Sequence, residues 1–138
     1  MSSLRILITD DYADWRRQVH LVLQARREWE VISEASDGLE AVQIAQNLKP
    51  DIILLDIGLP KLNGIEAAKR IRQVSPNSKI IFLSQNNDLD IVRAALTGVG
   101  GYVRKTDAKR ELLSAVDAVL RGKQFVSSSL KGLEGTRG

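Results

Sequence analysis

The sequence contains no cysteine and only one histidine among its 138 residues. Without cysteine the chain can form no disulfide, and it offers neither a thiol nucleophile nor a thiolate metal ligand. The single histidine, His20, falls in a helical pattern beside the apolar stripe, which favours a surface helical residue over a metal-binding or acid–base role. Most hydrolytic mechanisms that depend on histidine are therefore excluded.

Aromatic residues are also scarce, at 4% of the chain, and no apolar run approaches the ~20 residues that a membrane-spanning helix needs. The net charge is only +3, and the basic residues stand among acidic neighbours. With few rings to stack on bases, this composition argues against direct nucleic-acid binding by the domain alone. The start of the sequence shows no basic-then-apolar leader, so we expect a cytoplasmic protein without membrane contact.

The remaining composition, 43% hydrophobic and 27% charged, is typical of a soluble globular protein with one domain. Near-continuous apolar runs at residues 6–8, 52–55 and 80–83 predict strands that are buried on both faces, as in a parallel sheet. Shorter runs at residues 31–32 and 102–103 have more polar neighbours and predict edge strands.

Apolar residues at helical spacing lie between these runs, and the pairs Asp37–Glu40 and Asn63–Glu66 have the spacing of capping boxes at helix starts. The alternation predicts an α/β fold with a doubly wound, five-stranded parallel sheet of order 2-1-3-4-5, as in flavodoxin. We expect one domain over residues 1–125 and a flexible tail over residues 126–138, where the periodicity fades.

Charged residues follow three of the apolar runs at the point where each run ends. The pair Asp10-Asp11 follows the first, Asp56 follows the third, and Lys105 follows the last. Because the carboxyl ends of parallel strands share one edge of the sheet, we expect these groups to meet at the topological switch point. Carboxylates about 4 Å apart repel by roughly 4 kcal/mol at an effective dielectric near 20. Such a cluster is either partly protonated or built to hold a cation.

Oxygen ligands of this kind, few and partly hydrated, suit Mg²⁺ better than zinc or calcium. A carboxylate beside Mg²⁺ can act as a nucleophile toward phosphorus and form an aspartyl phosphate. Asp56 is the candidate nucleophile because it lies centrally, which leaves Asp10 and Asp11 to hold the metal. Lys105 would counter the phosphoryl charge, and the Ser84 hydroxyl, at the end of the fourth run, would donate to a phosphoryl oxygen.

Structural alternatives exist for each residue taken singly. Asp11 can cap the first helix, Asp56 can open the turn before Pro60, and Lys105 can be an ordinary surface lysine. Their joint occurrence at one predicted sheet edge favours a site. Position 58 is Gly58, where phosphatases of the haloacid dehalogenase type need a second aspartate as acid and base. Without that base an acyl phosphate should persist, which favours signalling over turnover.

Together these motifs resemble the receiver domain of two-component response regulators, over residues 4–125. The resemblance rests on the acidic pair, the run Asp56-Ile57-Gly58-Leu59-Pro60 leading to Gly64, Ser84 after an apolar run, and Tyr102 before Lys105. The stretches at residues 98–105 and 122–125 are most similar to receivers of the NarL/LuxR type. The resemblance implies a CheY-like fold and a signalling switch that catalyses only its own phosphorylation and slow dephosphorylation.

The resemblance also implies residue roles and partners. Asp56 would accept a phosphoryl group from the phosphohistidine of a sensor histidine kinase, and Ser84 and Tyr102 would form the switch pair. Mg²⁺ would be held by Asp10, Asp11, Asp56 and the carbonyl of Gly58. The switched surface would be the fourth helix, fifth strand and fifth helix. The sequence leaves open whether the domain forms a homodimer.

Three features depart from the family pattern. Gln85 stands where receivers often have a small residue, and Thr106 follows Lys105 where many have proline, so a cis bond is not expected there. NarL/LuxR-type regulators normally continue into a DNA-binding domain, which this sequence lacks. It is therefore either a stand-alone receiver with a downstream protein partner or the receiver half of a longer regulator. A flavodoxin-like nucleotide binder and a phosphate-independent interaction module are the alternatives.

Overall fold

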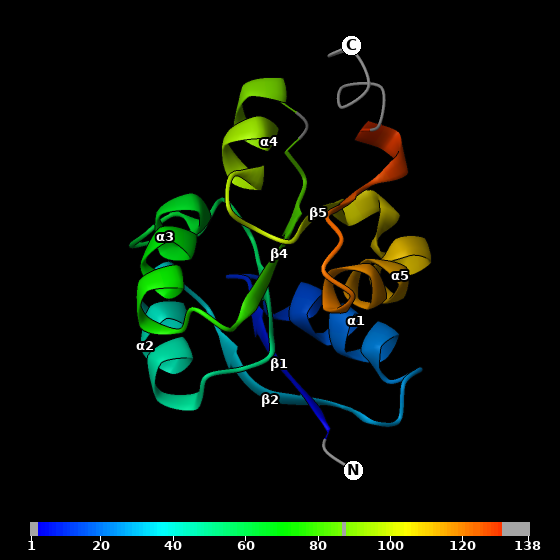
Figure 1. Ribbon diagram of the computed structural model, residues 1–138, viewed down its shortest axis with the longest axis horizontal. Helices are drawn as coiled ribbons and strands as arrows, with labels where there is room; N and C mark the ends of the chain where they lie inside the picture. Colours follow the sequence, from blue (N-terminus) through cyan, green and yellow to red (C-terminus); the bar gives the residue numbers. More distant parts are fainter. Residues whose placement is uncertain (1–2, 87, 131–138) are drawn as a thin grey trace.

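A computed structural model describes residues 3–86 and 88–130 of the chain (Figure 1). These residues form a parallel sheet of order β2-β1-β3-β4-β5-β6. The strands are β1 (Leu4–Thr9), β2 (Trp29–Ala35), β3 (Ile52–Leu55), β4 (Lys79–Ser84), β5 (Gly101–Arg104) and β6 (Phe125–Val126). The helices are α1 (Ala13–Leu23), α2 (Gly38–Leu48), α3 (Gly64–Val74), α4 (Leu89–Leu96) and α5 (Ala108–Leu120), with 3₁₀ turns η1 (Lys105–Asp107) and η2 (Ser128–Leu130).

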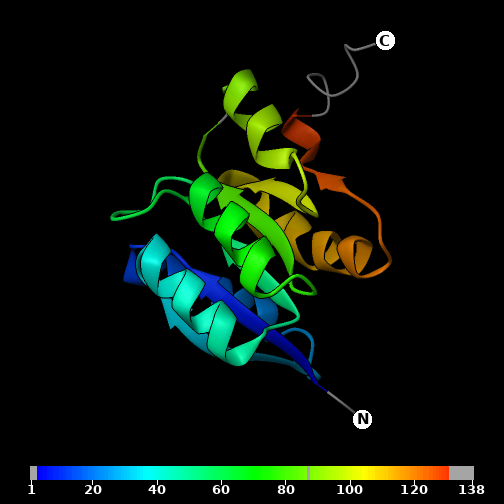
Figure 2. The same cartoon turned by 60° about the vertical axis from the view of Figure 1, so that its left-hand side comes forward.

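Helices cover both faces of the sheet, α1 and α5 on one side and α2 and α3 on the other (Figures 1 and 2). The strands alternate between two apolar clusters because successive side chains point to opposite faces. Leu7, Ile53 and Phe82 belong to the cluster under α2, α3 and α4. Ile6 and Ile81 belong to the cluster under α1 and α5. The apolar runs of the sequence are continuous because both sheet faces are buried.

The predicted order of the first five strands is confirmed, but the expectation of five strands is wrong. A sixth strand, β6, pairs in parallel with β5, with Gly101 opposite Phe125 and Tyr102 opposite Val126. Strand β5 is therefore an interior strand, and only β2 fulfils the expectation of an edge strand. The expected flexible tail began at residue 126; residues 126–130 carry β6 and η2. Residues 131–138 lie outside the described residues.

Both predicted capping boxes begin helices. The Asp37 side chain accepts a hydrogen bond from the amide of Glu40 at 2.8 Å, and that of Asn63 accepts one from the amide of Glu66 at 3.0 Å. The Glu40 carboxylate in turn accepts from the amide of Ser36, one residue before the cap. These caps fix the starts of α2 and α3 by satisfying amides that the helix leaves unpaired.

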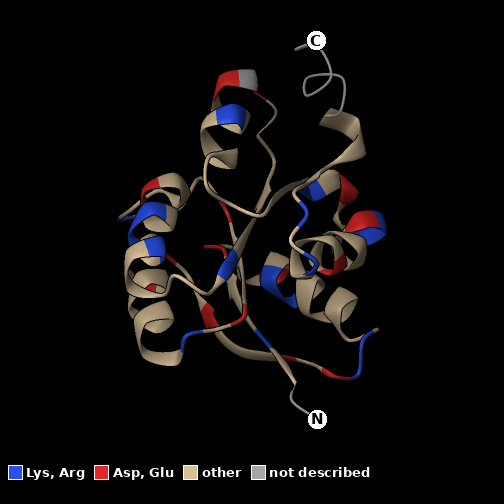
Figure 3. Cartoon of the chain, in the orientation of Figure 1, with Lys and Arg blue, Asp and Glu red and all other residues tan. Residues whose placement is uncertain are grey.

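Basic and acidic residues are interspersed along the helices in the view of Figure 3. The single histidine, His20, is partly exposed near the end of α1, where a helix favours a positive charge. In the part of the chain that the structure describes, no helix has both the length and the hydropathy to cross a membrane.

Candidate functional site

An open crevice of about 700 Å³ lies at the carboxyl ends of β1, β3, β4 and β5. The predicted site residues that line it are Asp10, Asp11, Asp56, Gly58, Ser84 and Lys105. Sequence positions almost a hundred residues apart therefore meet in one place, as the fold rule for parallel sheets requires. Tyr102 does not line the crevice but is fully buried on β5.

Backbone pairing between β1 and β3 places two of the acids side by side. Thr9 and Leu55 are partners in register, so Asp10 and Asp56 follow them at the same level of the sheet. The amide of Asp56 donates to the carbonyl of Thr9 at 3.1 Å, which continues the pairing beyond the strand ends. This register, rather than any local motif, brings the two carboxylates together.

The start of α3 holds the loop after Asp56 close to the sheet. The amide of Gly64 donates to the carbonyl of Ile57 at 2.7 Å. A Cβ atom at position 64 would lie 2.0 Å from the carbonyl oxygen of Asp56, so only glycine allows this approach. In contrast, a Cβ at Gly58 would meet no atom of the described residues within 4 Å. The crevice thus has one tightly packed wall and one open side.

Oxygens of Asp10, Asp11 and Asp56 lie within 4.8 Å of one another. Asp10 is only 1% exposed, and its Oδ1 accepts from the amide of Tyr12 at 2.9 Å. Asp56 is also buried, and its Oδ1 accepts from the amide of Ile57 at 2.8 Å. Asp11 is exposed and does not cap α1; the N-cap residue is Tyr12, whose amide is bound by Asp10.

One lysine lies within salt-bridge distance of two of these carboxylates. The Nζ of Lys105 lies 2.6 Å from Oδ2 of Asp10 and 3.6 Å from Oδ2 of Asp56. It also lies 5.2 Å from the centroid of the Trp15 ring, which adds a cation–π interaction. Burial raises the pKa of Asp56 above its ordinary value, Lys105 opposes that shift, and Asp10 adds to it. The described residues that line the crevice thus include three carboxylates and one ammonium group, which leaves the crevice electronegative.

This set of donors fits a hard divalent cation. Three carboxylates close together match the oxygen ligands that Mg²⁺ takes in proteins, and the open side leaves room for its remaining waters. The site residues available to hold the ion are Asp10, Asp11 and Asp56, with Gly58 at the rim.

Ser84 and Tyr102 are linked through Asn86, which sequence reasoning missed. The Oγ of Ser84 accepts from the amide of Asn86 at 3.1 Å, and the Tyr102 hydroxyl donates to the carbonyl of Asn86 at 2.7 Å. The Tyr102 ring thus points inward, with its centroid 6.2 Å from that of Phe82, and burial raises the pKa of its hydroxyl. These bonds use the backbone of Asn86, so residue type gives no signal for them.

Trp15 and Gln85 complete the surroundings of the crevice. Trp15 lies on α1, and its contact with Lys105 has no sequence signature. Gln85 is exposed and lines the crevice beside Ser84. The peptide bond between Lys105 and Thr106 is trans, as expected without proline.

The chain matches the family model described as "Response regulator receiver domain" over residues 6–117. It is 35% identical over 126 residues to the transcriptional regulatory protein DegU of Brevibacillus brevis, covering 91% of this chain and 53% of DegU. It is 32% identical over 126 residues to the nitrate/nitrite response regulator protein NarL of Escherichia coli K12, covering 91% of this chain and 58% of NarL. The chain thus spans somewhat over half the length of these relatives.

The fold is similar to the crystal structure of a two-component response regulator of the LuxR family from Aurantimonas sp. SI85-9A1. The TM-score is 0.91 at 29% sequence identity, and the match covers 99% of both chains. The matched family model spans most of the chain and includes all the acids of the crevice. The chain therefore belongs to the response regulator receiver domains, of the NarL/LuxR type and with a CheY-like fold.

Proposed function

We propose that this receiver domain is a phosphoacceptor switch in which Asp56 takes a phosphoryl group from the phosphohistidine of a sensor histidine kinase. The observation that carries the proposal is the position of Asp56, buried beside Asp10 and within 3.6 Å of the Lys105 ammonium, at the floor of an open crevice. An anion that entered here would meet a lysine, a hydroxyl and a bound cation.

In the transfer, an Oδ atom of Asp56 forms a bond to phosphorus while the phosphorus–nitrogen bond of the donor breaks. The departing imidazole keeps the electron pair of that bond and takes up a proton from solvent. Asp10, Asp11, Asp56 and the Gly58 carbonyl would hold Mg²⁺, which would supply positive charge to the phosphoryl oxygens.

Two residues of the crevice stabilise the product in this proposal. Lys105 forms an ion pair with the phosphoryl group, for which it has only to shift from its present position beside Asp10 and Asp56. The Ser84 hydroxyl rotates to donate a hydrogen bond to a phosphoryl oxygen. Since Gly58 supplies no acid or base for hydrolysis, the acyl phosphate is retained as a signal rather than turned over.

The phosphoryl group would be sensed through Ser84 and Tyr102, which share Asn86 as a hydrogen-bonding partner. Movement of Ser84 toward the phosphoryl group alters the segment that the Tyr102 hydroxyl binds, and with it the surface of α4, β5 and α5. We propose that a partner protein, a second copy of the chain or a DNA-binding output domain responds to that surface. The transcriptional regulators to which the chain is similar support the last of these.

Intact-mass measurement after incubation with acetyl phosphate and Mg²⁺ tests the proposal. We expect one added phosphoryl group in the natural protein and none in Asp56→Asn. Asp14→Asn is the matched control, because Asp14 is exposed on α1 and pairs only with Arg17 in the described structure. An unchanged mass of the natural protein, or labelling that persists in Asp56→Asn, would contradict the proposal. An acidic crevice also disfavours a flavodoxin-like nucleotide binder, because it repels phosphate before a cation is bound.

A further inference from the structure

The six residues 125–130, here called the clasp, lie along the outer edge of β5. They comprise β6 and η2. The amide of Phe125 donates to the carbonyl of Gly100 at 3.0 Å, and the amide of Ser127 donates to the carbonyl of Tyr102 at 2.9 Å. The strand that carries Tyr102 is therefore paired on both sides, and one partner is the clasp.

The serine side chains of the clasp form hydrogen bonds to β5, η1 and α5. The fully buried Ser127 accepts from the amide of Arg104 at 2.9 Å through its Oγ. The Oγ of Ser129 donates to Oδ2 of Asp107 at 2.6 Å. The bond from Ser129 lowers the pKa of Asp107 against the opposing effect of burial. Ser128 adds a hydrogen bond to Glu111 of α5. A run of serines that the sequence analysis placed in a flexible tail thus makes specific hydrogen bonds to the folded domain.

Two apolar side chains of the clasp are buried in the core. Val126 and Leu130 are 5% and 3% exposed and belong to the same apolar cluster as Tyr102. Val92 and Ala95 of α4 are members of that cluster too. The clasp therefore pairs with the strand that carries the inward-pointing tyrosine and contributes two side chains to the apolar cluster that this tyrosine shares with α4.

We propose that docking of the clasp and the inward position of Tyr102 stabilise each other, so that phosphorylation of Asp56 tightens the clasp and loss of the clasp weakens phosphorylation. This inference rests on the proposed phosphoacceptor function for its second half only. An outward movement of the ring would take it out of the apolar cluster to which Val126 and Leu130 also belong. Because coupling between two sites is reciprocal, each event must favour the other by the same factor.

The chain has two tyrosines, which makes the first half directly measurable. In protein labelled with 3-fluorotyrosine, ¹⁹F NMR should show one solvent-exposed signal from Tyr12, which is 64% exposed, and one buried signal from Tyr102. Tyr12→Phe assigns them. We expect Leu130→Ala and the milder Ser129→Ala to move or broaden the Tyr102 signal. Leu120→Ala, at a position 41% exposed, should not. A Tyr102 signal that stays in place while amide exchange of residues 125–130 rises would overturn the proposal.

The second half is tested with beryllium trifluoride, a mimic of the phosphoryl group, and Mg²⁺. Binding should slow amide exchange of residues 125–130 in the natural chain, and Leu130→Ala should weaken binding of the mimic by about fivefold or more. Binding without any change in exchange would refute the coupling. If no mimic binds and acetyl phosphate does not label Asp56, the proposed function fails, whereas the fluorine experiment still decides the contact between the clasp and Tyr102.

Discussion

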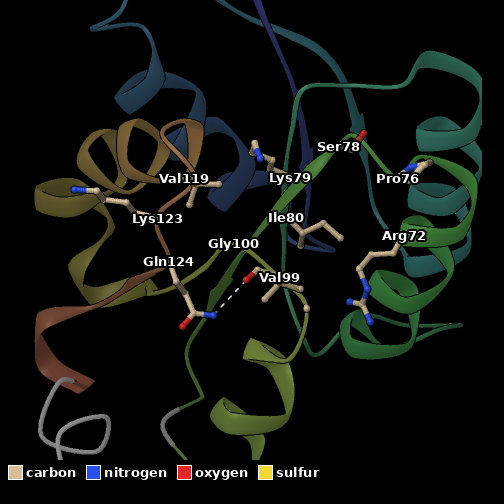
Figure 4. A pocket seen from close by; sticks show the side chains of 12 residues that line it. Arg72, Pro76, Ser78, Lys79, Ile80, Val99, Gly100, Val119, Lys123 and Gln124 are labelled. Atoms are coloured by element: carbon tan, nitrogen blue, oxygen red, sulfur yellow. Dashed lines mark hydrogen bonds between the residues drawn. The ribbon is translucent and has the colours of Figure 1, made fainter.

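The two ends of the parallel sheet differ in charge and in how that charge is held. At the carboxyl ends, Asp10 and Asp56 are buried and compete for Lys105. At the amino ends of β4 and β5, a cavity of about 310 Å³ is lined by Arg72, Lys79 and Lys123, without an acidic residue among the described residues that line it (Figure 4).

Two lysines at the basic end are exposed, whereas two of the acids at the acidic end are buried. Lys79 and Lys123 are exposed, and the side chains of Lys123 and Arg72 point in different directions in Figure 4. Exposed charges on long stems are hydrated and interact weakly. The acidic end has the same number of like charges, three, but buries two of them at fixed positions. Burial in a fixed geometry, and not the number of like charges, distinguishes a binding site from a charged surface.

The largest expected effect concerns the packed wall of the acidic end. Gly64→Ala should lower the free energy of unfolding by about 3 kcal/mol or more, because its Cβ would overlap the Asp56 carbonyl. Gly58→Ala, the matched control on the open side, should change it by less than about 0.5 kcal/mol. Urea denaturation measures both. Equal effects would show that the wall is not rigid.

Removing a cation should affect the two ends unequally. Lys105→Met should cost about 2 kcal/mol, less than the loss of a fully buried pair, because the Lys105 side chain is partly exposed in the open crevice. Lys123→Met at the basic end should stay within about 0.5 kcal/mol. A similar loss for both variants, measured by urea denaturation, would remove the distinction between the two ends.

Magnesium should bind at the acidic end of the sheet and thereby stabilise the folded protein. At a free Mg²⁺ concentration ten times the Kd, the folded protein should gain about 1.4 kcal/mol. Asp11→Asn should reduce this gain without harming the fold, since Asp11 is an exposed member of the acidic cluster. Thermal denaturation with and without Mg²⁺ provides the measurement. A gain that persists in Asp11→Asn would place the ion elsewhere.

The smallest expected effect is the pH dependence that Asp56 contributes. Burial raises the pKa of Asp56 in the folded state above its value in the unfolded chain. The folded protein is therefore favoured while Asp56 is protonated, below the unfolded pKa, and this stabilisation is lost as pH rises through the raised pKa. Without metal, Asp56→Asn should remove this decline and raise the stability at neutral pH. Denaturation curves across the acidic range decide this, and Asp14→Asn should leave the decline intact.

Sequence reasoning located the central fold and the crevice because both depend on strong, local signals. Continuous apolar runs marked the interior strands, and the fold rule then placed Asp10, Asp56 and Lys105 together. It missed β6 because two residues followed by serines resemble a linker, and their pairing partner, β5, is more than twenty residues away. It missed Asn86 and Trp15 because a backbone carbonyl and a ring face leave no pattern in residue type.

The sixth strand determines where this domain can be separated from anything attached to it. A cut before residue 125 would strip β5 of its outer neighbour and expose a row of unpaired amides and carbonyls. Open edges of this kind recruit strands from other molecules and promote aggregation. A fusion joined after Leu130 keeps that edge closed, whereas one joined at the end of α5 would not.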